Sequence, residues 1–171
     1  MPRLWEQLIS RLGRVVPTGQ ASIDGILGLD NETHKIIALS EWVTAKIQQR
    51  GYNSLTEAEK TFNVVYWLEA EINNGGFNQY FFNSAGDYAQ ETVMALRRIG
   101  AHHTSEILLA AMGLFPGRAP SQDHYKRQEQ VLSLGEQGEA AMEELDQEFY
   151  AYADPIGSLL IEYVRQHKNQ F

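Results

Sequence analysis

Apolar residues recur every three to four positions along most of the chain, and this spacing limits the fold more than any other feature. In one segment, Ile36, Leu39, Val43 and Ile47 fall on one side of a predicted helix. The same period of about 3.6 residues recurs in most other segments, and no segment alternates apolar and polar residues as a half-buried strand does. The sequence therefore predicts an all-α fold of about seven or eight helices.

Capping residues and glycines predict where these helices begin and end. The predicted starts are Asp30, a capping box of Ser54 with Glu57, Asp87 with Gln90, Thr104, Ser121, and Asp154 with Pro155. Stops are predicted at Gly51, at residues 73–76, at Gly100 and at residues 116–117, and Gly135 with Gly138 predicts a break. No long linker or repeat divides the chain, so residues 1–171 are expected to form one domain. Its parts are an N-terminal helix and loop over 1–29 and a core over 30–171.

Several classes of protein are excluded by what the sequence lacks. Because there is no cysteine, disulfide scaffolds, thiol nucleophiles and zinc sites with thiolate ligands are excluded. No run of about 18 apolar residues is present, which excludes a membrane-spanning helix. Glu6 and Arg11 interrupt the first residues where a signal peptide is apolar, so the expected location is the cytoplasm. Arg3, Arg11 and Arg14 share a helix face, but three charges are too few to hold a protein on a membrane, and core packing is expected there.

The net charge of −8 comes from one region of the chain. Between Gln128 and Val164 there is no lysine or arginine. This stretch contains nine acidic residues, namely Glu129, Glu136, Glu139, Glu143, Glu144, Asp146, Glu148, Asp154 and Glu162, so it carries −9 and the rest of the chain carries +1. Such a region repels phosphates, and direct binding of nucleic acid through it is not expected.

Residues 136–152 are predicted to form an amphipathic helix that concentrates this charge. Met142, Leu145, Phe149 and Tyr152 cluster on its apolar side. The candidate binding carboxylates are Glu136, Glu139, Glu143, Glu144, Asp146 and Glu148. They cover about 18 Å of helix, or roughly 3 Å per charge, close to the spacing of about 3.4 Å between phosphates along one DNA strand. A solvated helix face is the simpler explanation of such a charge run, and a basic partner is the alternative.

A second unusual segment, residues 73–88, is rich in amides and aromatic rings. Its centre consists of Asn74, Gly75, Gly76, Phe77, Asn78 and Gln79. Amides among rings could line a pocket that hydrogen-bonds a small ligand. A structural explanation is favoured, because the glycines allow a sharp exit from the preceding helix and the amides can satisfy backbone groups at helix ends.

Motifs for catalysis and metal binding are absent from the sequence. The histidines are His34, His102, His103, His124 and His167, and none belongs to an H-E-x-x-H or Glu-x-x-His motif. Serine nucleophile motifs, P-loops and dinucleotide fingerprints are absent as well. We therefore expect no metal site, no cofactor and no catalytic residue, and thus a protein that is not an enzyme.

Several stretches of the chain are similar to one protein family. They are residues 71–89 (EINNGGFNQYFFNSAGDYA), residues 91–99, residues 114–116 (LFP), residues 145–150 (LDQEFY) and the apolar positions of residues 159–164. The family is the bacterial DNA-mimic protein family of the DUF4375 type, and the resemblance covers about residues 30–164. The Asn-Gly-Gly-Phe-Asn-Gln segment is its most specific part.

The resemblance implies an all-α cytoplasmic protein, often dimeric, whose acidic surface imitates double-stranded DNA. Such a protein occupies the DNA-binding face of a helix-turn-helix transcription regulator and alters repression. The resemblance carries over no specific binding residue. The leading hypothesis is therefore a binding protein whose carboxylates on residues 136–148 stand where phosphates stand, with a second strip of Glu57, Glu59, Glu69 and Glu71 on the helix before residues 73–76. The attraction is expected to weaken as salt rises.

Two other classes of function remain open from the sequence. The first is a small-molecule sensor or an enzyme built on residues 74–88. The second is a subunit of a larger assembly that uses its apolar surface.

Overall fold

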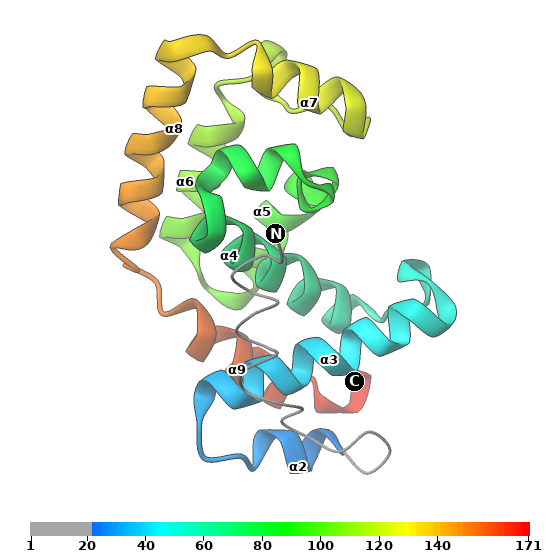
Figure 1. The fold of residues 1–171 in the computed structure, drawn as a ribbon. Helices are drawn as coiled ribbons and strands as arrows, with labels where there is room; N and C mark the ends of the chain where they lie inside the picture. The colour runs from blue at the N-terminus through cyan, green and yellow to red at the C-terminus, as the bar shows by residue number, and fades with distance from the viewer. Residues whose placement is uncertain (1–21) are drawn as a thin grey trace. The chain divides into compact units, whose positions relative to one another are not determined.

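The structure is a computed structural model that describes residues 22–171 (Figure 1). Within this part of the chain there are eight α-helices and no strand, which confirms the predicted all-α fold. The helices are α2 (Ile23–Leu27), α3 (Glu32–Arg50), α4 (Glu57–Phe82), α5 (Ala89–Ile99), α6 (His102–Met112), α7 (His124–Leu132), α8 (Gly135–Tyr150) and α9 (Ile156–Gln166). Short 3-10 segments are η1 (Tyr52–Ser54), η2 (Ser84–Tyr88), η3 (Pro116–Arg118) and η4 (Lys168–Gln170). The predicted N-terminal helix with its three arginines lies outside the described residues.

The described helices form two compact units, with the boundary inside α4. The first unit contains the residues up to Asn63 together with Ile156–Phe171, and the second is Val64–Pro155. The prediction of a single domain stays a prediction. None of the helices in residues 22–171 has the length and apolar character needed to cross a membrane.

In the first unit, α3 packs against α2 and α9. Leu39 and Val43 of the predicted apolar stripe are buried, as are Leu160 and Val164 of α9. The Ser158 hydroxyl of α9 donates to the Glu32 carboxylate at the start of α3. α2 lies where a loop was predicted, so that expectation is wrong: the Ser22 hydroxyl accepts from Gly25 N at 3.0 Å and caps this short helix.

In the second unit, α5 and α6 pack as a hairpin and α8 packs against α6. Gly100 ends α5 with φ of +89°, a left-handed conformation that glycine adopts without strain. α8 runs beside α6 and leads back through a short turn to α7 (Figure 1). This arrangement leaves one long side of α8 without a covering helix in its own unit.

A buried arginine fixes α7 against the end of α4. Arg127 is fully buried, and its guanidinium donates to the carbonyl oxygens of Phe81 at 2.7 Å, Ser121 at 2.8 Å and Asn83 at 3.1 Å. It also pairs with the Asp87 carboxylate. Because the last carbonyls of an α-helix have no intrahelical partner, one side chain here satisfies the end of α4 and anchors α7.

Several predicted helix ends are correct and others are displaced. α3 ends at Gly51 and α5 ends before Gly100, as predicted. The corrected N-caps are Asn31 for α3 in place of Asp30, and Asp123 for α7 in place of Ser121. The capping box is also displaced, since Thr56 and Glu59, rather than Ser54 and Glu57, exchange side-chain and backbone hydrogen bonds. The chain does break at Gly135, with φ of +64°, but Gly138 lies inside α8.

Candidate protein-interaction surface

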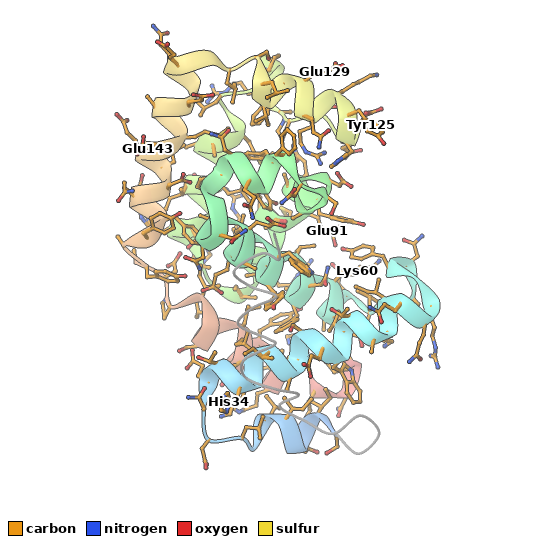
Figure 2. All side chains as sticks on the ribbon, viewed as in Figure 1. His34, Lys60, Glu91, Tyr125, Glu129 and Glu143 are labelled. Carbon is orange, nitrogen blue, oxygen red and sulfur yellow. The ribbon has the colours of Figure 1, made fainter. Side chains whose placement is uncertain are left out.

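The predicted acidic helix is an uninterrupted α-helix with one buried and one exposed side. Met142 and Phe149 are buried on the inner side. Glu136, Glu139, Glu143 and Glu144 are exposed, and Glu143 points away from the packed helices in Figure 2. Because no residue between Glu136 and Glu148 leaves the helical conformation, the predicted spacing of about 1.5 Å per residue applies throughout.

Four of these carboxylates have no partner in the described chain. Neither a hydrogen bond nor an ion pair within residues 22–171 involves the side chains of Glu136, Glu139, Glu143 or Glu144. Most surface acids elsewhere are engaged, for example Glu106 with Arg97 at 2.9 Å and Asp24 with Lys168 at 2.9 Å. An unbalanced row of like charges destabilises a folded protein through self-repulsion, so the face of α8 is a cost to stability that binding a cation-rich surface would offset.

Glu148 lies one turn after Glu144, at the edge of the acidic face that adjoins α6. Its carboxylate is 3.4 Å from His103 Nε2, and both side chains are about half exposed. This pair is ionic when the imidazole is protonated. Glu148 thus stays available to solvent at one edge of the acidic face.

Asp146 has a structural role that the sequence prediction missed. Its Oδ1 accepts a 2.7 Å hydrogen bond from the Phe77 backbone N, where α4 resumes after a kink at Gly75 and Gly76. A side chain on Gly76 would begin 2.1 Å from Asp146 Oδ2, and Gly76 has φ of +71°, so only glycine fits there. Asp146 therefore caps the second half of α4, and its assignment as a partner-binding carboxylate stays a prediction. Without it, the other five carboxylates cover the same length at about 3.6 Å per charge, a lower density than predicted.

Burial raises the pKa of Asp146 above its ordinary value of 3.8, opposed by the Phe77 hydrogen bond and assisted by the charge of Glu143. The folded protein thus binds a proton here more readily than the unfolded chain, so this residue's contribution to the free energy of unfolding falls as pH rises above 3.8. We expect Asp146→Asn, which keeps the acceptor oxygen and removes the charge, to match or exceed the wild-type stability at neutral pH. Asp146→Ala, which removes the cap, is expected to cost about 1 kcal/mol.

Urea unfolding of both variants at a series of pH values checks this prediction. The wild type should lose stability relative to Asp146→Asn as pH rises from 4 to neutrality. If Asp146→Asn were as unstable as Asp146→Ala, the backbone hydrogen bond to Phe77 would not be the role of this residue.

The predicted second acidic strip is largely internal. Glu59 is fully buried, and its carboxylate accepts hydrogen bonds from Lys46 Nζ at 2.7 and 2.8 Å and from Thr56 N at 2.8 Å. Glu71 is buried too. The assignment of Glu59 to a partner-binding surface is therefore wrong, because its charge is neutralised inside the fold. Glu57 is exposed and remains a candidate.

The amide and aromatic segment is mostly helical, and the predicted helix stop at residues 73–76 is present as a kink, because Gly75 and Gly76 have non-helical backbone angles inside α4. Phe77, Tyr80 and Phe81 are fully buried, which confirms that the rings form core. The amides of Gln79 and Asn83 donate to Glu71 Oε2 at 2.5 and 2.7 Å. These contacts support the structural explanation of the segment.

Three amide and tyrosine contacts secure the C-terminal end of α8. Tyr150 OH donates to the Ile72 carbonyl at 2.8 Å. Tyr152 has φ of +49°, accepts from Asn73 Nδ2 at 2.6 Å and donates to Glu69 Oε1 at 3.1 Å. Burial raises the pKa of Tyr152 to about 12, so this phenol stays protonated at neutral pH. Asn74 and Asn78 are half-buried and make no such contact within the described chain.

The second unit carries all of the excess charge. It contains 14 acidic and five basic residues, a net charge of −9, whereas the other residues sum to +1. One of its five basic residues, Arg127, is buried and paired. Glu71 of the same unit is buried as well, so the charge of the remaining residues is still −9. In the described residues, no three histidine, aspartate or glutamate side chains gather in a geometry that could hold a metal ion.

One comparison with known proteins gives a match. A protein-family model described as DMP19-like protein matches residues 53–167, more than half of the chain. The matched range runs from η1 to the residue after α9, and it includes both the amide and aromatic segment and α8. No curated protein and no solved structure matches the chain.

Proposed function

Because this chain belongs to the DMP19-like protein family, a family of DNA mimics, we propose that it binds a basic DNA-binding protein and blocks that protein's access to DNA. The DNA-mimic resemblance of the sequence is thereby confirmed, and the DUF4375 designation is not part of the match. The proposed partner is a helix-turn-helix transcription regulator. The protein would act without catalysis, without a cofactor and without binding nucleic acid itself, in the cytoplasm.

One observation carries the proposal. Glu136, Glu139, Glu143 and Glu144 form a row of exposed carboxylates, without a partner in residues 22–171, on a helix whose other side is packed. Ordinary solvated helices place lysine or arginine at i,i+4 positions, which lowers self-repulsion. α8 has none. Because the self-repulsion of these carboxylates is not relieved within the helix, their surface is suited to a partner that supplies positive charge.

The mechanism is competition for the same basic residues. Lysine and arginine side chains that contact phosphates would meet the glutamates of α8 instead. Charge-assisted hydrogen bonds to carboxylates have the same donors and similar geometry as those to phosphates. The helix offers about 18 Å of such acceptors, which matches about five phosphate spacings on one strand.

Pairing of two copies would extend this match. Dimeric regulators read two half-sites about 34 Å apart, whereas one α8 helix spans only about half that length. We propose that the protein acts as a homodimer related by a two-fold axis, so that one acidic face meets each half of the regulator.

The alternative function, a small-molecule sensor or enzyme on residues 74–88, has few side chains left to bind a ligand. Its rings are core and the amide of Gln79 holds Glu71, so such a site would depend on Asn74 and Asn78. A screen for ligands that raise the melting temperature of the wild type but not of Asn78→Ala tests this alternative. Because the Asn78 side chain makes no hydrogen bond within residues 22–171, its variant should itself fold normally.

A pull-down from host lysate tests the proposal. Tagged protein should retain a basic DNA-binding protein that elutes at moderate salt and is released by duplex DNA. The control bait carries Glu136→Lys, Glu139→Lys and Glu143→Lys and should not retain it. Capture of the same DNA-binding protein by both baits, or its retention in the presence of excess duplex DNA, would contradict the proposed surface.

A further inference from the structure

The outer side of α7 exposes apolar surface next to the acidic face. Tyr125 and Leu132 are 77% and 75% exposed, the two highest values among the large apolar side chains that the structure describes. They are seven residues apart, so they share one side of the helix, and Glu129 lies between them. Figure 2 shows Tyr125 and Glu129 on the outer side of α7. The buried residues of this helix, Arg127 and Val131, are on the opposite side.

The packing of α7 does not require these exposed residues. Tyr125 makes one ring contact, an edge contact with His124 at 5.6 Å between centroids, and most of its surface faces solvent. Glu129 is exposed and has no ion pair within residues 22–171. Tyrosine and arginine are enriched at the centres of protein interfaces, which makes the exposed ring of Tyr125 a candidate contact for an arginine of a partner.

The three side chains have the spacing that one guanidinium group needs. Residues four apart on a helix have Cβ atoms about 5 to 6 Å apart, so the Tyr125 ring and the Glu129 carboxylate can reach the same group. A guanidinium can stack on an aromatic face and donate to a carboxylate from its edge at the same time. Leu132, three residues after Glu129, can cover the methylene stem of the same side chain.

We propose that Tyr125, Glu129 and Leu132 form a binding site for an arginine side chain of the protein partner. This inference rests on the proposed function. It adds an aromatic ring face, which a DNA phosphate does not offer to an arginine. Charge complementarity selects the occupant, since the adjoining α8 face in the same unit is uniformly acidic. The short turn through Ser133, Leu134 and Gly135 joins this site to the row that begins at Glu136. The site would favour regulators that present arginine, rather than lysine, at the edge of their DNA-binding surface.

Two peptides of equal charge test the proposal with defined probes. Fluorescently labelled nona-arginine and nona-lysine are titrated with the full-length protein, and Kd is measured by anisotropy. Cation–π attraction at an exposed site is worth about 0.5 to 1 kcal/mol, so the wild type should bind nona-arginine about two- to fivefold more tightly than nona-lysine. Equal Kd values for the two peptides would overturn the proposal.

Variants at Tyr125 separate the ring from its apolar area. Tyr125→Phe should keep the preference for arginine, while Tyr125→Leu should reduce the Kd ratio to about one. Met94→Ala is the matched control, because Met94 is another exposed apolar residue of the second unit, 58% exposed on α5. A preference that survives in Tyr125→Leu, or that is lost in Tyr125→Phe or Met94→Ala, would contradict an aromatic arginine site.

The failure of this inference differs from failure of the proposed function. Glu136→Lys with Glu139→Lys and Glu143→Lys should weaken the binding of both peptides and leave a preference for nona-arginine, because the Tyr125 ring is retained. If the wild type displaces DNA from a regulator but shows no preference for arginine, the proposed DNA mimicry is supported and the proposed arginine site is wrong. If the arginine preference is present but no DNA-binding protein competes with DNA, the site stands and the proposed function is wrong.

Discussion

Replacing Arg127 by methionine is expected to lower the free energy of unfolding by about 3 to 5 kcal/mol, the range measured when one partner of a buried ion pair is removed. The side chain is fully buried and donates to three carbonyl oxygens as well as to Asp87. Methionine fills part of the volume and supplies no donor. Each buried carbonyl left without a partner costs about 1 to 3 kcal/mol. Asp87 is partly exposed, and water can solvate its carboxylate, so the carbonyls account for most of the loss.

Urea unfolding followed by circular dichroism measures this effect, with Lys126→Met as the control. Lys126 is the exposed neighbour of Arg127 on α7, so its substitution removes the same charge and should change stability by less than about 0.5 kcal/mol. Similar unfolding free energies for the two variants would show that α7 is not anchored through Arg127.

Reversing three charges on α8 is expected to weaken partner binding at least about 100-fold. Each exposed ion pair contributes up to about 1 kcal/mol, and three lost pairs amount to about 3 kcal/mol before any repulsion is added. The variant carries Glu136→Lys, Glu139→Lys and Glu143→Lys. It omits Asp146, whose substitution would disturb the cap on Phe77, and therefore the fold should be preserved.

A second triple variant controls for net charge. Asp30→Lys, Glu41→Lys and Glu162→Lys change the total charge by the same amount in the first unit, and binding should change less than about threefold. Neutral Glu→Gln substitutions at the three α8 positions should also lower the slope of log Kd against log salt, because fewer ion pairs form. Equal losses in the two reversed variants would assign the attraction to net charge rather than to the face of α8.

Local signals predicted most of the helical framework. Gly51 and Gly100 end helices in the structure because glycine relieves the backbone at a helix terminus, whatever surrounds it. The apolar stripes of α3 and α9 were predictable for the same reason, since a period of 3.6 residues depends only on neighbours in sequence. Gly138 was wrongly predicted as a break, because its role is steric: a Cβ atom at position 138 would lie 2.5 Å from the Cβ of Leu134, one turn earlier. Glycine therefore fits inside α8 at this position.

The errors arose where distant residues meet. Asp146 caps Phe77 across 69 positions, and Asp154 accepts from Thr104 N across 50 positions, so neither contact leaves a local pattern. Arg127 precedes the acidic region and resembles a surface residue, yet its partners are the carbonyls at the end of α4. Thr56 and Glu59 satisfy the same capping pattern as Ser54 and Glu57, and Glu59 also pairs with Lys46, 13 positions away, a contact that the local pattern does not include.

The exposed side of α8 was predictable because it required only helical geometry and a count of charges. Glu136, Glu139 and Glu143 are exposed as that geometry predicts. The sequence could not distinguish them from Asp146, which has the same charge and nearly the same angular position but faces the kink of α4. Asp146 packs against α4 for two reasons: the Phe77 backbone N–H needs an acceptor, and Gly76 has no side chain to occupy the space of the carboxylate.

Competition with duplex DNA tests whether this protein acts as a DNA mimic. The regulator isolated in the pull-down is bound to fluorescently labelled duplex DNA, and this protein is added at increasing concentration. We expect complete release of DNA, an apparent Kd of the protein that rises linearly with free DNA, and, for the α8 triple variant, the same release only at a concentration at least about 100-fold higher. A ternary complex of protein, regulator and DNA, or release that the triple variant achieves equally well, would contradict it.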